Sequence, residues 1–293
     1  MRQSESLFYD IRGLRYHVRR WPGRAVSAPR MVLLHGWMDV SASFQFLVDA
    51  LAGDWDVYAP DWRGYGLTEW ANADCYWFPD YLADLDALLE HVAPGAPANL
   101  VGHSLGGNVA SLYAGVRPER VCKLVNLEGF GLPPTRPEQA PKRTLRWLDE
   151  LRDRPGLKPY RSFADLADRM QKGNPRLARE RADFLARHWG MENERGEVVL
   201  RGDPAHKIVS PILYRLAESR ACWQQVSAPV LWVDAAESDT LKRMGIGGEP
   251  YAERRAAFRN LRYVTLPAAG HMLHHDQPEE LARHVEAFLA DGG

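Results

Sequence analysis

The sequence predicts an α/β fold, in which helices cover both faces of a mostly parallel sheet and one helical segment is inserted. Short, continuously apolar runs, typical of strands buried on both faces, alternate along the chain with longer helical segments. Such alternation is typical of parallel sheets. It is interrupted once, at about 132–223, where helix-like segments follow one another. We therefore expect a helical lid between two strands of the core.

The expected strands begin with a hairpin and continue as buried runs. Residues 7–10 and 14–21 alternate apolar and polar side chains around Gly13, which is typical of an antiparallel hairpin. The run 31–34 is continuously apolar and ends at His35 and Gly36, as a buried strand would. Further strands are expected at 57–59, 98–101, 121–127, 230–233 and 263–266.

Helices are expected in the segments that connect these strands. Those of the core are expected at 42–51, 79–92, 105–116, 251–258 and 278–289. Those of the insertion are expected at 144–152, 163–171 and 176–189. This organisation predicts a core made of residues 1–131 and 224–293 and a lid, or cap, made of residues 132–223.

The most informative motif is Gly102-His103-Ser104-Leu105-Gly106-Gly107, directly between an expected strand and an expected helix. A serine in so sharp a turn needs glycines two positions to either side, because side chains there would clash. The turn lifts the Ser104 hydroxyl above the sheet. It also places the Leu105 N–H at a helix N-terminus, where it can stabilise an oxyanion. The pattern predicts a nucleophile at Ser104; a glycine-rich turn with an ordinary serine is the alternative.

With this motif and this order of elements, the chain resembles the alpha/beta-hydrolase superfamily over nearly its whole length apart from the lid. Three further segments are similar to the family pattern: His35-Gly36-Trp37 to its oxyanion loop, 61–66 (Asp-Trp-Arg-Gly-Tyr-Gly) to the turn after its fourth strand, and Gly270-His271 to its catalytic histidine loop. The resemblance implies the alpha/beta-hydrolase fold with an eight-stranded sheet. It also implies an oxyanion hole formed by the N–H groups of Trp37 and Leu105.

His271 is the expected base. A loop histidine suits this role because its unperturbed pKa lies near neutrality. Its neighbours His274, His275 and Asp276 invite interpretation as a metal site. Adjacent side chains diverge, however, and no Cys or Glu completes a familiar ligand spacing. We therefore expect neither a metal nor a cofactor.

The acid of the triad has three candidates, because one carboxylate must hold the imidazole tautomer. The first is Asp239, in the loop after strand 230–233, although this loop lacks the usual glycine and Asp239 lies one position later than the commonest spacing. The second is Glu128, at the end of strand 121–127, and the third is Glu237. For each, a surface or loop-capping carboxylate is the alternative.

The resemblance implies a serine hydrolase that cleaves a small carboxylic ester, or a related acyl compound, through an acyl-enzyme. The same Ser104 and His271 could also serve hydrolysis of a carbon–carbon bond, cofactor-free peroxidation or acyl transfer. A ligand-binding scaffold without catalysis is a further alternative. The intact serine, histidine, oxyanion loop and available carboxylates count against it.

The substrate is expected to be a small apolar or aromatic acyl compound, because many of the 10 Trp and 11 Tyr residues lie in loops around the expected site and in the lid. The expected substrate-binding residues are Trp37, Trp62, Trp147 and Trp189. For any aromatic residue of the lid, packing onto the core is the alternative.

Charge gives no indication of a polyanionic partner. The 37 Lys and Arg residues almost balance the 38 Asp and Glu residues, so a nucleic acid or a membrane surface is not expected to bind. The lid arginines Arg143, Arg146 and Arg152 are expected to form its solvated face, and no compact pair among them indicates an acidic substrate.

The three cysteines are scattered and predict neither a disulfide framework nor a zinc site. No apolar run reaches the roughly 18 residues of a membrane span, and the first residues lack the apolar stretch of a signal peptide. The expected location is the cytoplasm.

Overall fold

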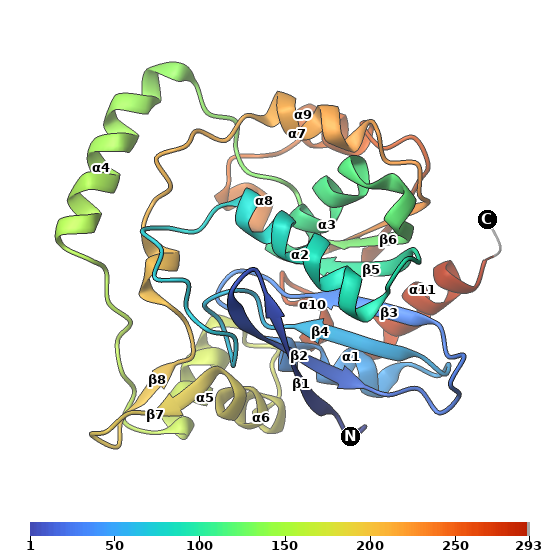
Figure 1. Ribbon diagram of the computed structural model, residues 1–293, viewed down its shortest axis with the longest axis horizontal. Coiled ribbons are helices and arrows are strands. Elements are labelled where there is room, and N and C mark those ends of the chain that lie inside the picture. Colours follow the sequence, from blue (N-terminus) through green and yellow to red (C-terminus); the bar gives the residue numbers. More distant parts are fainter. Residues whose placement is uncertain (292–293) are drawn as a thin grey trace.

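The computed structural model describes residues 1–291 and places an eight-stranded sheet between two layers of helices (Figure 1). The strand order is β1-β2-β4-β3-β5-β6-β9-β10. β2 pairs antiparallel with β1 and β4, and every other neighbouring pair is parallel. The strands are β1 (Glu5–Ile11), β2 (Leu14–Trp21), β3 (Arg30–Leu34), β4 (Asp56–Pro60), β5 (Ala98–His103), β6 (Val121–Leu127), β9 (Val230–Ala235) and β10 (Leu261–Leu266). The predicted fold class is confirmed.

Each face of the sheet has its own apolar core. On one face, α1 (Gln45–Ala50) and α11 (Pro278–Ala290) pack against alternate side chains of the central strands, such as Leu33 and Val101. On the other face, α2 (Phe78–Val92) and α3 (Leu105–Val116) cover side chains such as Val32 and Leu100. Two-sided burial explains why these strands are continuously apolar in sequence. No helix among residues 1–291 is both long and apolar enough to span a bilayer.

Between β6 and β9 the chain leaves the sheet and forms several helices and a small hairpin. They are η3 (Pro137–Gln139), α4 (Ala140–Arg152), α5 (Phe163–Gly173), α6 (Arg179–Trp189), β7 (Gly190–Glu192), β8 (Val198–Leu200), η4 (Pro204–Lys207) and α7 (Leu216–Trp223). The hairpin β7–β8 was not predicted, because strands of three residues leave no apolar run. The last of these helices, α7, packs against the core helix α3. We call residues 132–223 the inserted segment.

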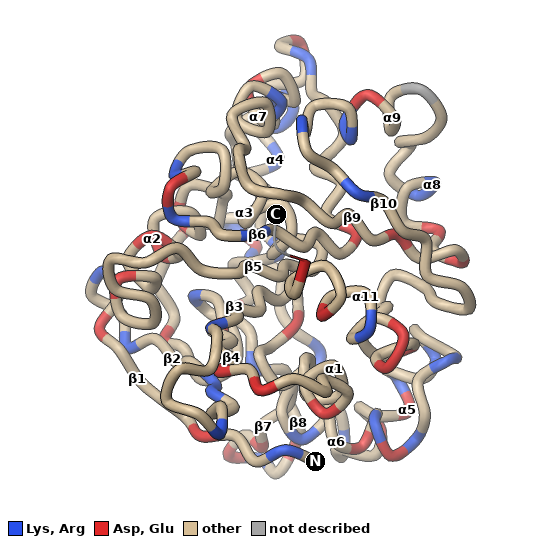
Figure 2. Tube along the Cα trace, turned by 90° about the vertical axis from the view of Figure 1, so that its right-hand side faces the viewer, with Lys and Arg blue, Asp and Glu red and all other residues tan. Residues whose placement is uncertain are grey.

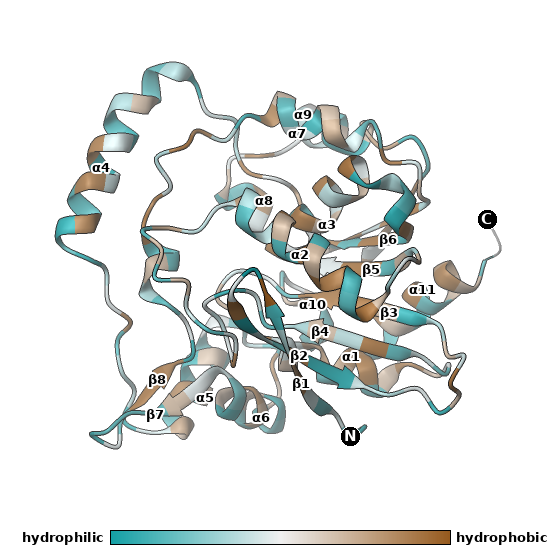
Figure 3. Cartoon of the chain, viewed as in Figure 1, coloured by the Kyte–Doolittle hydropathy of each residue, from teal (hydrophilic) through white to brown (hydrophobic). Residues whose placement is uncertain are grey.

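The inserted segment is attached to the core unevenly. α5 and α6 enclose a small apolar cluster that includes Leu166, Leu185 and the core residue Phe46. α4 has no buried residue and lies apart from the sheet, at the left of Figure 1. Apolar and polar residues alternate along it (Figure 3), and Leu145 remains 58% exposed. In the view of Figure 2, positive and negative residues are interspersed along the chain, as the near-zero net charge suggests.

Besides η2 (Pro118–Arg120), which follows α3, the core contains three further short helical pieces. Two follow the strands that end nearest the site: α8 (Thr240–Arg243) after β9, and α10 (Leu273–Asp276) after β10. The third is η1 (Ser41–Phe44), which begins the helical segment expected at 42–51 and leads into α1. Expected helix 251–258 is found as α9 (Glu249–Arg255). Pieces of one turn are too short to show helical periodicity in sequence.

A buried ion pair holds the turn after β4 against α2. The Arg63 guanidinium donates to both oxygens of Asp84, at 2.6 and 2.5 Å, and the Tyr16 hydroxyl donates to Asp84 at 3.0 Å. Asp84 is completely buried and Arg63 is 7% exposed. Because neither charge reaches bulk water, each depends on the other. The pair therefore positions residues 61–66, whose Tyr65 supports the site described below.

Asp84→Ala is expected to lower the free energy of unfolding by about 3–5 kcal/mol, because the buried Arg63 guanidinium loses both hydrogen bonds to Asp84 and keeps the more distant Asp80, at 3.7 Å, as its acidic partner. Glu90→Ala is the matched control on the same helix: Glu90 pairs with Arg120 at the surface, so the loss should stay below about 1 kcal/mol. Chemical denaturation measures both. Equal losses in the two variants would contradict the role given to Asp84.

Candidate active site

Ser104 lies between the last residue of β5 and the first residue of α3, with φ 51° and ψ −112°. Its N–H donates to the Leu127 carbonyl at 2.8 Å. Glycine is required at both flanking positions because backbone atoms of other residues lie too close for a Cβ. A Cβ on Gly102 would lie 2.4 Å from the Gly106 carbonyl oxygen, and a Cβ on Gly106 would lie 2.0 Å from the Leu34 carbonyl oxygen. The sharp turn expected from the sequence is thus present, and Ser104 lines a cavity that other parts of the core and the inserted segment also enclose.

His271 connects Ser104 to a carboxylate. It lies in the loop between β10 and α10. Its Nε2 is 3.1 Å from Ser104 Oγ and its Nδ1 is 2.7 Å from Glu128 Oε2. Because Nδ1 faces a carboxylate acceptor, we assign the ring proton to Nδ1, which leaves the Nε2 lone pair free to accept the Ser104 hydroxyl proton.

Glu128, directly after β6, is buried and held by several donors. Its Oε1 accepts the Ala235 N–H at 2.9 Å, and its Oε2 accepts the Ser238 hydroxyl at 2.6 Å as well as His271. Its backbone has φ 54° and its N–H donates to the Val233 carbonyl. These contacts aim the carboxylate at the histidine. They come from β9 and the loop that follows it.

The other two candidate acids pair with arginines and not with His271. The structure therefore corrects the expectation that placed Asp239 before Glu128. Asp239 precedes α8, its side chain is 67% exposed, and it pairs with Arg243 at 3.1 Å. Glu237 pairs with Arg176 of the inserted segment. The loop after β9 instead presents the Ser238 hydroxyl inward, where it binds Glu128. The missing glycine and the late position of Asp239 were the sequence signals of this difference.

The expected oxyanion donors are the backbone N–H groups of Trp37 and Leu105. Leu105 is the first residue of α3, so its N–H has no acceptor within the helix. Trp37 follows β3, the strand that pairs with β5. Neither N–H donates to another group among residues 1–291, and both residues line the same cavity as Ser104. The pair can therefore stabilise negative charge that develops on an oxygen bound to Ser104.

The cavity above Ser104 has a volume of about 360 Å³ and lies between the carboxyl ends of the strands and the inserted segment. Most of its wall is apolar or aromatic. From the core come Trp37, Tyr76, Trp77, Phe78, Tyr81, Phe130 and Met244, and from the inserted segment Leu132, Ile208 and Val209. This composition suits an apolar ligand group next to the serine.

Of the four tryptophans expected to bind substrate, only Trp37 lines this cavity. Trp62 is completely buried because its indole N–H donates to the His35 carbonyl at 2.9 Å, which turns the ring inward. Trp147 packs against the core cluster, and Trp189 lines two other hollows. Arg143 and Arg146, expected on a solvated face, do line the cavity.

His206 anchors the inserted segment to the core. Its ring stacks between Tyr65 and Tyr76, with centroid distances of 3.7 and 3.9 Å. Its Nε2 lies 3.1 Å from the Arg63 carbonyl, and its own carbonyl accepts the Trp37 indole N–H at 3.2 Å. Burial lowers the pKa of His206 to about 3. No motif or spacing in the sequence singles out this residue.

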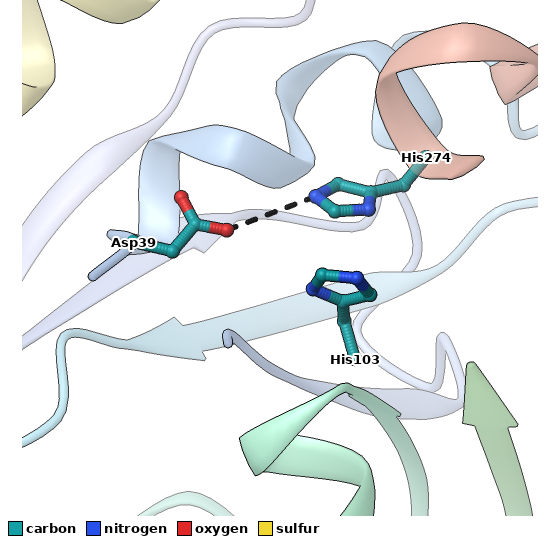
Figure 4. Close-up of side chains that lie close together, drawn as sticks. All are labelled: Asp39, His103 and His274. Carbon is teal, nitrogen blue, oxygen red and sulfur yellow. Dashed lines mark ion pairs between the residues drawn. The ribbon is translucent and has the colours of Figure 1, made fainter. Parts of the chain in front are cut away.

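Of the residues considered for a metal site, His274 belongs to a group of possible ligands in the described chain, whereas His275 and Asp276 do not. Asp276 accepts the Gly270 N–H and the Asn174 amide, and His275 binds Ser43. Instead Asp39, His103 and His274 lie together behind His271, all buried, and point toward one another (Figure 4).

In this cluster, Asp39 Oδ2 is 3.8 Å from His274 Nε2. Burial raises the pKa of Asp39 to about 7 and holds the pKa values of both histidines well below their ordinary value. Asp39 Oδ2 and the Nδ1 atoms of His103 and His274 have no hydrogen-bond partner among the described residues. Within residues 1–291, this is the group that could hold a metal ion; an ordered water would satisfy the same atoms. His103 Nε2 contacts the His271 carbonyl at 2.8 Å, so the cluster supports the histidine loop from behind.

Comparison with known proteins gives a consistent result. Residues 31–284 match the sequence profile of the alpha/beta hydrolase family. A "serine hydrolase-like protein" of Danio rerio is 27% identical over 267 residues, which cover 88% of this chain and 81% of the relative. A pimeloyl-[acyl-carrier protein] methyl ester esterase of Vibrio atlanticus is 37% identical over 126 residues, covering 42% of this chain and 40% of that protein.

Solved structures agree on the fold. The thioesterase domain from the curacin biosynthetic pathway superposes with a TM-score of 0.84 at 23% identity, covering 97% of this chain and 99% of that one. A hypothetical protein of Pseudomonas aeruginosa PAO1 superposes with a TM-score of 0.86 at 24% identity, covering 98% and 99%. At these identities the likeness shows the fold alone.

His206 is expected to make the protein less stable in acid. Its folded-state pKa of about 3 lies below the ordinary value of 6.5, so between these pH values the unfolded chain binds a proton that the folded chain does not. The stability is fully present above pH 6.5 and falls with decreasing pH, by up to about 1.4 kcal/mol per pH unit for this group. His206→Phe should therefore show a shallower loss between pH 6 and 4 in urea titrations. Identical slopes for variant and wild type would refute this account.

Proposed function

The chain belongs to the alpha/beta hydrolase family, and from this premise we propose that it is a serine hydrolase acting on a carboxylic ester or related acyl compound. The observation that carries the proposal is the continuous relay from Ser104 through His271 to Glu128, with contacts of 3.1 and 2.7 Å. Acyl transfer to serine requires a nucleophile that is hydrogen-bonded to a base, and a base that is hydrogen-bonded to an orienting acid.

The reaction follows from the positions of the atoms. His271 Nε2 takes the Ser104 proton as Oγ attacks the carbonyl carbon, and Glu128 stabilises the imidazolium that forms. The N–H groups of Trp37 and Leu105 stabilise the tetrahedral oxyanion. His271 then gives its proton to the leaving alcohol. A water deprotonated by the same histidine releases the acid from Ser104.

The wall of the cavity supports an apolar acyl group. The rings of Trp37, Tyr76, Trp77 and Phe78 lie on the same cavity as the serine. The inserted segment supplies one side of this cavity, so that apolar contact and shape select the substrate. In this proposal the inserted segment acts as the lid of the site.

Ser104→Ala is expected to abolish turnover of 4-nitrophenyl butyrate and covalent labelling by a fluorophosphonate probe, because both need the Oγ nucleophile. The variant should unfold at the same urea concentration as the wild type within experimental error or slightly higher, since the strained backbone remains and only one hydroxyl is lost. Retained esterase activity in this variant would exclude Ser104 as the nucleophile. Ring-cleavage diketones in the same assay separate ester hydrolysis from hydrolysis of carbon–carbon bonds.

Glu128→Gln is expected to reduce kcat/KM by about 10³–10⁴-fold, the order of loss found when the acid of a comparable triad becomes an amide. The amide can present its NH₂ group to His271 and favour the wrong tautomer. Asp239→Asn is the matched control, because Asp239 contacts only Arg243 at the surface, and its rate should stay within about twofold. A larger loss in Asp239→Asn than in Glu128→Gln would reverse the assignment of the acid.

A further inference from the structure

Three cationic side chains line the active-site cavity, and all of them come from the inserted segment. Arg143 and Arg146 lie on α4, and Lys207 lies in η4. Ser104 and His271 come from the core. The cavity therefore has a reacting end supplied by the core and a positively charged wall supplied by the inserted segment.

Two of these cations lack an acidic partner. The half-buried Arg143 donates through Nε to the Ser210 carbonyl at 2.6 Å, and Lys207 donates to the Gly156 carbonyl at 3.0 Å. Within residues 1–291, neither forms an ion pair with a carboxylate within 4 Å. Arg146 does pair, with Glu150 at 2.6 Å. Burial and the charge of Arg146 lower the pKa of Arg143, as expected for a cation with a like-charged neighbour.

No acid inside the cavity is available to compensate this charge. The one Asp or Glu that lines it, among the described residues, is Glu128. Its oxygens already accept Ala235, Ser238 and His271. Since unpaired cations beside an apolar cavity attract anions, a ligand with an anionic group would supply the negative charge that the described lining lacks.

We propose that the substrate is an acyl compound with an anionic group, a carboxylate or phosphate, at its far end, which Arg143 and Lys207 bind while the acyl carbonyl meets Ser104. This inference rests on the proposed function and names the substrate class more closely. A guanidinium and an ammonium on the wall of the same cavity suit such a group, because both donate charge-assisted hydrogen bonds to its oxygens. The aromatic side chains that line this cavity hold the apolar chain.

The test compares 4-nitrophenyl esters of one chain length that end in a carboxylate, a phosphonate or an uncharged methyl ester. The wild type should show kcat/KM about tenfold or more higher for an anionic ester than for the uncharged one, which is the effect of one charge-assisted hydrogen bond. The larger ratio identifies which anion is preferred. Added salt should reduce the preference, because it screens exposed charges.

Arg143→Gln and Lys207→Gln should each reduce the ratio of anionic to uncharged turnover several-fold. Lys142→Gln is the matched control, since Lys142 is exposed on the same helix and does not line the cavity, so its ratio should equal that of the wild type. Equal turnover of all three esters by the wild type would overturn the inference. So would a preference for anionic esters that survives the Arg143→Gln and Lys207→Gln double variant.

Binding separates failure of this inference from failure of the proposed function. Adipate, a dicarboxylate that cannot be hydrolysed, should bind the wild type in calorimetry and bind the double variant at least tenfold more weakly. If no ester is turned over but this difference in binding is present, the proposed hydrolysis fails and the anion site stands. If the uncharged ester is turned over and adipate binds wild type and double variant equally, hydrolysis stands and the anion site fails.

Discussion

The site depends on the backbone of Ser104, which has a positive φ that residues other than glycine rarely adopt. This conformation requires α3 to begin against the ends of β3 and β5, so closely that neither Gly102 nor Gly106 can carry a Cβ. The same approach brings the Leu105 amide beside the loop that carries Trp37. One strained residue thus positions both the proposed nucleophile and the proposed oxyanion donors.

Strained backbone gathers around this edge of the sheet. Six non-glycine residues of the described chain have a positive φ, and four of them are Met38, Ser104, Glu128 and Ala268. These follow β3, β5, β6 and β10, the strands whose carboxyl ends surround the site. Each such residue costs of order 1–3 kcal/mol, so the packed sheet below must hold them in place. The free energy gained by packing the two apolar cores offsets the strain of these residues.

The sequence was sufficient for the fold, and it singled out Ser104 and His271, two members of the proposed relay, because the patterns that indicate them are local. Apolar runs and turn glycines are contiguous in sequence, so the eight strands and the Ser104 turn could be predicted. The acid could not, because β6 and β9 are neighbours and both end beside His271. The choice depends on contacts of Glu128 with residues 107 and 110 positions away. The directions of side chains could not be predicted from the sequence either. Trp62 turns inward to a carbonyl, and Arg143 faces the cavity because of where α4 lies.

The register of two strands has a consequence for how the protein becomes reactive. His103 pairs with Leu127, so Ser104 and Glu128 are the next residues of adjacent parallel strands, and the sheet alone fixes their separation. The residue that joins them, His271, comes 143 positions after Glu128. During synthesis on the ribosome, the backbones of Ser104 and Glu128 can therefore be paired before His271 exists, whereas the Glu128 carboxylate is aimed only once Ala235 and Ser238 have been made. Under the proposed mechanism a nascent chain carries no activated serine, and reactivity appears only when β10, the last strand, has joined β9.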